Sequence, residues 1–213
     1  AVDGPLLILA GPGSGKTRGI VHRVAHLLES GAAQADQVLA VTFTNKAAGE
    51  MKSRVSQLMG RALWDFGRLD QRGPIICTFH SLCLRILRHY APLVGLPGNF
   101  SIYDSADQTR VLKEAIKLLD LSVTNFPPGQ VHATISHAKN QLLTAEAYAN
   151  RAGQFYERQV ARIYTKYQKL LDQNQALDFD DLLLRACLAL RDHPEMLAEL
   201  QLLLEIADSG MTY

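Results

Sequence analysis

The chain has 213 residues, of which 47% are hydrophobic and 20% charged, so its composition excludes a disordered segment and favours one large or two small globular domains. With 22 Lys and Arg against 21 Asp and Glu the net charge is +1, so any nucleic-acid contact must be local. The apolar runs are too short to span a bilayer, no signal-peptide pattern opens the chain, and three scattered cysteines predict neither disulfides nor a zinc site. We therefore expect a reduced, cytoplasmic protein without membrane contact.

The first half of the chain alternates short apolar runs with helical periods. Residues 6–9 predict a strand, which leads through a glycine-rich turn into a helix that ends near Gly31. Residues 38–41 predict a second strand with a helix closed by Gly60, and residues 75–78 predict a third strand with its own helix. Because these strands are almost entirely apolar, they predict an α/β fold with a parallel sheet covered by helices on both faces.

Beyond about Pro92 the strand-like runs stop and helical periods take over. Ser105–Gln108 has the pattern of a capping box at a helix start, and Asp178 can cap a later helix. Between them, two periods predict helices with these inward positions: Val131, Ile135, Ala138 and Leu142 in the first, and Val160, Ile163, Tyr164, Tyr167 and Leu171 in the second. This pattern predicts an all-helical subdomain, appended or inserted, over 92–177, between an α/β part at 1–91 and a return towards it at 178–213.

Residues 10–17 read Ala-Gly-Pro-Gly-Ser-Gly-Lys-Thr between a predicted strand and a predicted helix, which is the context of a phosphate-binding P-loop. The glycines allow backbone N–H groups to surround a phosphate, and the helix start adds partial positive charge. Lys16 can reach the β- and γ-phosphates, and the Thr17 hydroxyl can ligate Mg²⁺. The strict pattern has Gly in place of Ala10. We predict ATP or GTP binding with Mg²⁺ by these residues: Ala10, Gly11, Pro12, Gly13, Ser14, Gly15, Lys16 and Thr17.

Two phenylalanines directly follow predicted strands. Phe43 comes after the strand at 38–41, where open α/β sheets place ligands, and a ring there can stack on an unpaired base. Phe79 holds the equivalent position after the next strand. Residue type alone favours packing of both rings in the core. The polar neighbours that can meet phosphate oxygens are Thr42, Thr44, Asn45 and Lys46 at the first strand and Thr78 and His80 at the second.

Several segments resemble, in the same order along the chain, motifs of UvrD/Rep-type superfamily 1 DNA helicases. They are the P-loop, residues 42–48 (Thr-Phe-Thr-Asn-Lys-Ala-Ala), residues 78–81 (Thr-Phe-His-Ser), residues 135–140 and residues 178–183 (Asp-Phe-Asp-Asp-Leu-Leu). The resemblance implies a P-loop NTPase fold of RecA-like type. It also implies an ATP-dependent DNA helicase or translocase of 3′-to-5′ polarity, acting on single strands and single/double-strand junctions in replication or repair.

The resemblance also implies roles for individual residues. It places Phe43 on the DNA surface and leaves Phe79 open between base stacking and packing. Arg18 is similar to the family's nucleotide-contacting arginine, and a surface ion pair is the alternative. The residues expected to touch DNA are Thr42, Phe43, Thr44, Asn45, Lys46, Thr78 and His80.

Three other polar groups favour structural interpretations. His22 and His26, four residues apart, indicate a solvated helix face rather than a metal pair, because no third ligand is near. The helical spacing of Tyr164 and Tyr167 favours the core over base stacking. The acidic segment 178–181 follows no apolar strand, so it predicts a helix start rather than the Asp-Glu motif that holds Mg²⁺ and the attacking water.

Some parts of the family's motor have no counterpart that we can identify in the sequence. These are the Asp-Glu motif, an upstream adenine-reading Gln, and a second RecA-like domain with its arginine finger. We therefore expect a fragment or truncated product that binds ATP and DNA but does not hydrolyse ATP at a motor's rate. Two other functions stay open: a different P-loop enzyme such as a small-molecule kinase, and a non-enzymatic remnant that binds nucleotide and DNA.

Overall fold

The computed structural model describes residues 9, 11, 13–60 and 73–204, except for the side chains of 202–204. The chain forms two compact units, unit 1 (1–85 with 193–213) and unit 2 (86–192). The division falls within helix α3 (Phe79–His89). Within the described residues, no helix combines the length and the hydrophobicity needed to cross a bilayer.

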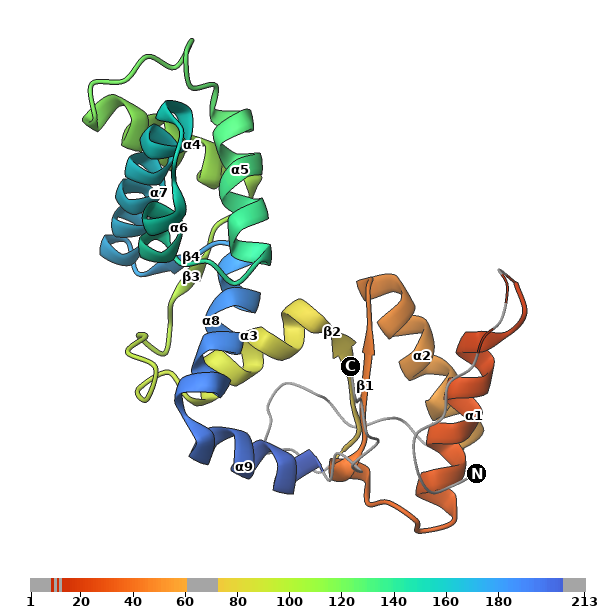
Figure 1. Cartoon of the computed structure of the whole chain (residues 1–213). Helices are drawn as coiled ribbons and strands as arrows, with labels where there is room; N and C mark the ends of the chain where they lie inside the picture. Colours follow the sequence, from red (N-terminus) through yellow and green to blue (C-terminus); the bar gives the residue numbers. More distant parts are fainter. Residues whose placement is uncertain (1–8, 10, 12, 61–72, 205–213) are drawn as a thin grey trace. The chain divides into compact units, whose positions relative to one another are not determined.

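Unit 1 contains a small parallel sheet with helices packed against it (Figure 1). Strand β1 (Leu39–Thr42) pairs with strand β2 (Ile75–Thr78), so that Thr42 lies opposite Thr78. The other elements of this unit are α1 (Lys16–Glu29), the short 3₁₀ helix η1 (Ala35–Gln37), α2 (Asn45–Leu58), the first part of α3, and α9 (Pro194–Leu204).

Alternate side chains of the sheet enter two different layers. Ala40 and Ile76 are register partners, and both pack with apolar side chains of α1 and α2. Ile75 and Cys77 belong to a separate cluster, which includes Leu82 of α3. The described strands are therefore parallel and covered on both faces, as their continuous apolar character predicted.

The carboxyl-terminal ends of α1 and α2 lie where the sequence predicts them. Gly31 and Gly60 follow these helices with φ of 69° and 62°, a left-handed conformation that favours glycine and ends a helix. The strand predicted at residues 6–9 falls outside the described residues except for Leu9. Leu9 belongs to no strand and is 85% exposed, so that strand stays a prediction for residues 6–8 alone.

Unit 2 is a group of helices with one short pair of strands (Figure 1). Its helices are the end of α3, α4 (Ser105–Leu118), α5 (Pro128–Asn140), α6 (Ala145–Arg151), α7 (Phe155–Gln173) and α8 (Phe179–Asp192). One apolar core joins α4, α5 and α7. It contains the inward positions predicted over 131–138 and 160–171, so the helical periods identified this core correctly.

The prediction that this region is all-helical is wrong. Strand β3 (Ser101–Ile102) pairs in parallel with strand β4 (Ala176–Leu177). Each strand has only two residues, and neither an alternating nor a continuous apolar pattern can be recognised over so short a run. The pairing joins segments on either side of the helices α4 to α7, which no local pattern indicates.

Two helix ends in unit 2 also differ from the predictions. The cap of α4 is Asp104, one residue before the predicted capping box, because its carboxylate accepts the N–H groups of Ala106 and Asp107 at 2.8 and 3.0 Å. Leu142 lies beyond the end of α5, with φ of 57° and its side chain exposed. The helix therefore stops before this last apolar position of the predicted period.

Candidate nucleotide and DNA site

The P-loop has the backbone conformation that its glycines permit. Gly13 and Gly15 have φ of 77° and 84°, where a side chain would be strained. The Ser14 hydroxyl donates to the carbonyl oxygen of Gly11 at 2.6 Å, which closes the turn. Ala10 and Pro12 lie outside the described residues.

The loop leads directly into the start of α1. Gly15 is the N-cap, so no side chain accepts the N–H groups of the first turn, and that turn holds no acidic residue. These N–H groups, from Lys16 onward, point out of the helix start together with the positive end of its dipole. The described part of the loop therefore fits an anion such as a nucleotide phosphate.

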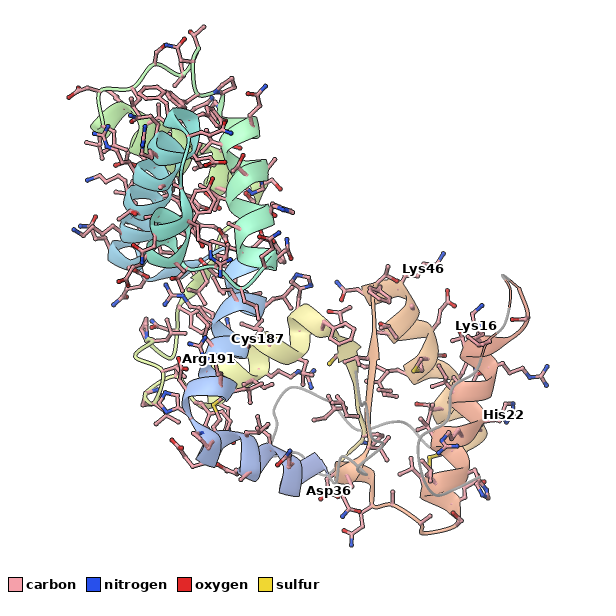
Figure 2. The ribbon with its side chains drawn as sticks, viewed as in Figure 1. Lys16, His22, Asp36, Lys46, Cys187 and Arg191 are labelled. Atoms are coloured by element: carbon pink, nitrogen blue, oxygen red, sulfur yellow. The ribbon has the colours of Figure 1, made fainter. Side chains whose placement is uncertain are left out.

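Three side chains at the start of α1 complete this arrangement. The Lys16 ammonium donates to the Gly11 carbonyl at 2.8 Å, so its side chain folds back over the loop. Thr17 is half-buried, and Arg18 is exposed. Arg18 forms no ion pair with a carboxylate among the described residues, and its role stays a prediction. Figure 2 shows Lys16 and Lys46 at the same end of unit 1, at the starts of α1 and α2.

The carboxyl ends of β1 and β2 bring the two phenylalanines together. Thr42 and Thr78 are register partners, so Phe43 and Phe79 leave the sheet side by side. Their ring centroids lie 6.0 Å apart with the planes tilted by 54°, within the range of a favourable aromatic pair. Phe43 is 92% exposed and Phe79 is 45% exposed. Core packing, which residue type alone favours, is therefore wrong for Phe43.

Hydrogen bonds hold the loop that carries Phe43. The Thr44 hydroxyl accepts the N–H of Ala47 at 3.1 Å and so caps α2. The Thr42 hydroxyl donates to the carbonyl of Thr44 at 3.0 Å, across the base of the ring. Asn45 and Lys46 follow in the first turn of α2, and both are exposed. Phe43 therefore projects from a short, internally bonded loop beside a helix start.

The equivalent loop after β2 uses its polar residues differently. Thr78 is buried, its hydroxyl accepts the N–H of Ser81 at 3.2 Å, and it shares a hydrogen bond of 2.9 Å with the Ser81 hydroxyl. Thr78 thus fixes the start of α3, while His80 is half-buried in its first turn. Like the hydroxyls of Thr42 and Thr44, the Thr78 hydroxyl is therefore already engaged in the fold, and unlike them it belongs to a buried residue.

Two histidines of α1 and three cysteines are further groups that the sequence singled out. His22 and His26 are both exposed on α1, as predicted for a solvated helix face. His22 is labelled in Figure 2. Cys77 in β2, Cys83 in α3 and Cys187 in α8 form no disulfide within the described part of the chain. Burial raises the pKa of Cys77, which keeps this thiol protonated within the sheet.

A buried ionic cluster in unit 2 was not predicted from the sequence. Lys139 of α5 is 1% exposed, and its ammonium lies 2.7 Å from Asp178 and 2.8 Å from Asp181. The two aspartates cap α8 reciprocally: the N–H of Asp181 donates to Asp178 at 2.7 Å, and the N–H of Asp178 donates to Asp181 at 3.3 Å. This confirms the prediction that residues 178–181 start a helix.

Tyrosine and glutamine side chains of α7 complete the cluster. The Tyr167 hydroxyl donates to Asp178 at 2.9 Å, and Gln168 donates to Asp181 at 3.2 Å. Burial, reinforced by the Asp178 carboxylate, raises the pKa of Tyr167, so this hydroxyl keeps its proton and remains a donor. Tyr164 is equally buried and donates to the carbonyl of Leu143 at 3.0 Å. Both tyrosines therefore belong to the core, as predicted.

Comparison with known proteins agrees with the motifs. The family model described as UvrD/REP helicase N-terminal domain matches residues 1–206. A relative named "ATP-dependent DNA helicase PcrA" from Bacillus subtilis is 44% identical over 195 residues, which cover 92% of this chain and 25% of the relative. Relatives of the same name from Staphylococcus epidermidis and Staphylococcus aureus are 42% and 43% identical, each over 92% of this chain and 26% of their own length.

The chain thus spans about a quarter of the length of the curated relatives that it matches. The family match covers both units, from the P-loop through the acidic start of α8. It agrees with the order of motifs along the sequence and with the parallel strand pair that carries Phe43 and Phe79. The chain belongs to the UvrD/REP helicase N-terminal domain family.

Proposed function

We propose that this chain binds Mg·ATP at the P-loop and single-stranded DNA at the carboxyl edge of β1 and β2, within an ATP-dependent DNA helicase or translocase. The observation that carries the proposal is the exposure of Phe43 beside Phe79. Both rings follow the carboxyl ends of β1 and β2 in unit 1, the unit that also contains the P-loop. An exposed aromatic pair serves to stack on bases, which phosphoryl transfer to a small molecule does not require. By family, the polarity is 3′ to 5′, the DNA includes single/double-strand junctions, and the process is replication or repair.

The nucleotide part of the proposal uses a RecA-like arrangement of residues 1–91. The N–H groups of the loop and of the first turn of α1 hold the phosphates, and Lys16 moves from the Gly11 carbonyl to the β- and γ-phosphates. The Thr17 hydroxyl would ligate Mg²⁺, which would neutralise part of the phosphate charge. Arg18 follows Thr17, is exposed, and would contact the nucleotide.

The DNA part of the proposal uses stacking and phosphate contacts. An exposed phenylalanine ring leaves apolar surface in water, and a stacked base removes that surface from water. Phe79 supports the ring of Phe43 from one side. Asn45, Lys46 and the start of α2 meet the phosphates, and His80 does so from α3, while Thr78 holds the α3 loop. Stacking does not depend on base identity, so binding is tolerant of sequence.

Phe43→Ala is expected to weaken single-strand binding by ~1–3 kcal/mol, because it removes the stacking surface. Folding should be unaffected, since the ring is 92% exposed. Fluorescence anisotropy of a labelled single strand measures the affinity. Phe155→Ala is the matched control, because Phe155 is also exposed but lies on α7 in unit 2.

The two variants must differ if the proposal is right. Phe155→Ala should bind single strands like the wild type, and Phe43→Ala should retain its affinity for Mg·ATP. Equal single-strand affinities of wild type and a folded Phe43→Ala protein would remove the DNA site from this edge. Stimulation of ATP hydrolysis by DNA in a protein that carries this chain separates a motor from a kinase, which lacks DNA dependence, and from a remnant, which lacks turnover.

A further inference from the structure

The two phenylalanines at the carboxyl ends of β1 and β2 differ in how their backbones are held. Strand β2 ends at Thr78 and α3 begins at Phe79, so Phe79 is a residue of the helix itself. Strand β1 ends at Thr42 and α2 begins at Asn45, so Phe43 lies in a short loop between them. The rings thus follow register partners of one sheet, but of the two only Phe79 is carried by a helix.

The first turn of α3 is fastened to the sheet. The buried Thr78 hydroxyl accepts the N–H of Ser81 at 3.2 Å and shares a hydrogen bond of 2.9 Å with the Ser81 hydroxyl. Leu82, three residues after Phe79, packs against the apolar cluster of β2 that contains Ile75. A helical backbone also restricts the rotamers of an aromatic side chain. Phe79 therefore presents its ring from a fixed position.

The geometry of the ring pair limits how a base can use it. The centroids of Phe43 and Phe79 lie 6.0 Å apart, and the planes are tilted by 54°. A base held between two rings needs parallel planes about 7 Å apart, twice the contact distance between carbon atoms. The pair therefore does not enclose a base. A base can lie flat on Phe43, which is almost fully exposed, while Phe79 keeps its contact with the same ring.

We propose that Phe79 is a positioning residue, which holds the ring of Phe43 in the orientation in which a base of single-stranded DNA stacks on it. The inference rests on the proposed function, because it takes Phe43 as the stacking ring. An exposed side chain loses rotational freedom when a ligand fixes it, and this loss weakens binding. A ring that a neighbour already holds loses less freedom, so the contribution of Phe79 to affinity requires Phe43.

The test is a double-mutant cycle on the affinity for a labelled single strand, measured by fluorescence anisotropy. Its members are the wild type, Phe79→Leu, Phe43→Ala and the variant with both substitutions. Phe79→Leu removes the ring but introduces an apolar, good helix former, so α3 should remain folded, which circular dichroism checks. With Phe43 present, Phe79→Leu should weaken binding by about 2- to 12-fold, the range of a favourable aromatic pair. In the Phe43→Ala background the same substitution should have no effect.

The conservative variant Phe79→Tyr is the matched control, because it keeps the ring at the same place on α3. Its single-strand affinity should lie close to that of the wild type. A loss as large as that of Phe79→Leu would show that the ring is not the group that acts.

Other outcomes would also contradict the inference. An equal loss on Phe79→Leu with and without Phe43 would mean that Phe79 contacts DNA directly or acts only through the stability of α3. If Phe43→Ala weakens single-strand binding while Phe79→Leu does not, the positioning role fails and the proposed function stands. If Phe43→Ala itself binds single strands like the wild type, the proposed function fails, and the positioning role fails with it.

Discussion

Lys139→Ala is expected to lower the free energy of unfolding of unit 2 by about 3–5 kcal/mol, the cost of breaking a buried ion pair by removing one partner. The substitution would leave the Asp178 and Asp181 carboxylates buried, with only hydrogen bonds to balance two negative charges. It would also open space beside the rings of Tyr164 and Tyr167, over which the ammonium lies at 5.7 and 5.4 Å from the centroids.

Urea denaturation followed by near-ultraviolet circular dichroism of the tyrosines measures this effect, because Tyr164 and Tyr167 flank the cluster. Lys113→Ala is the matched control, since Lys113 is an exposed lysine on α4 and its removal should change stability by less than about 0.5 kcal/mol. A Lys139→Ala protein as stable as Lys113→Ala would show that the cluster does not hold α5 to the start of α8.

Lys16→Ala is expected to weaken Mg·ATP binding by ~1.5–3 kcal/mol, or about 10- to 150-fold, through loss of a charge-assisted hydrogen bond to phosphate. Backbone N–H groups of the loop and of α1 would remain, so binding should weaken rather than disappear. Lys16 is exposed, and its ammonium donates to a backbone carbonyl of the exposed loop residue Gly11, so the variant should fold.

Calorimetric titration with Mg·ATP provides the measurement. Lys46→Ala serves as the control, because Lys46 is also an exposed lysine in the first turn of a helix in unit 1 but lies after β1. Its nucleotide affinity should equal that of the wild type. If the two variants bind Mg·ATP alike, the loop is a turn without the predicted ligand.

Local patterns in the sequence predicted the elements whose cause is local. The apolar runs at β1 and β2 predicted a buried parallel pair, and the glycine-rich segment before α1 predicted a turn with left-handed residues. Tyr164 and Tyr167 repeat with the helical period and are buried as that period requires. Asp178 precedes an apolar helical run and caps it.

Features that depend on long-range contacts could not be predicted in this way. Lys139 is separated from Asp178 by 39 residues, and a lysine is an unusual residue to bury without a known partner. The β3 and β4 strands are too short to leave a pattern. Phe43 is apolar and follows a buried strand, so residue type alone placed it in the core, whereas the family motif placed it at the surface, where the structure has it.

The path of the single strand over Phe43 is the central claim, and photocrosslinking tests it most directly. A single strand that contains a halogenated uracil is bound, irradiated and digested, and mass spectrometry locates the adducts. We predict an adduct on the peptide that contains Phe43, at a yield that falls sharply in Phe43→Ala and is retained in Lys16→Ala. Adducts confined to other peptides, with a yield unchanged in Phe43→Ala, would contradict a DNA site at the ends of β1 and β2.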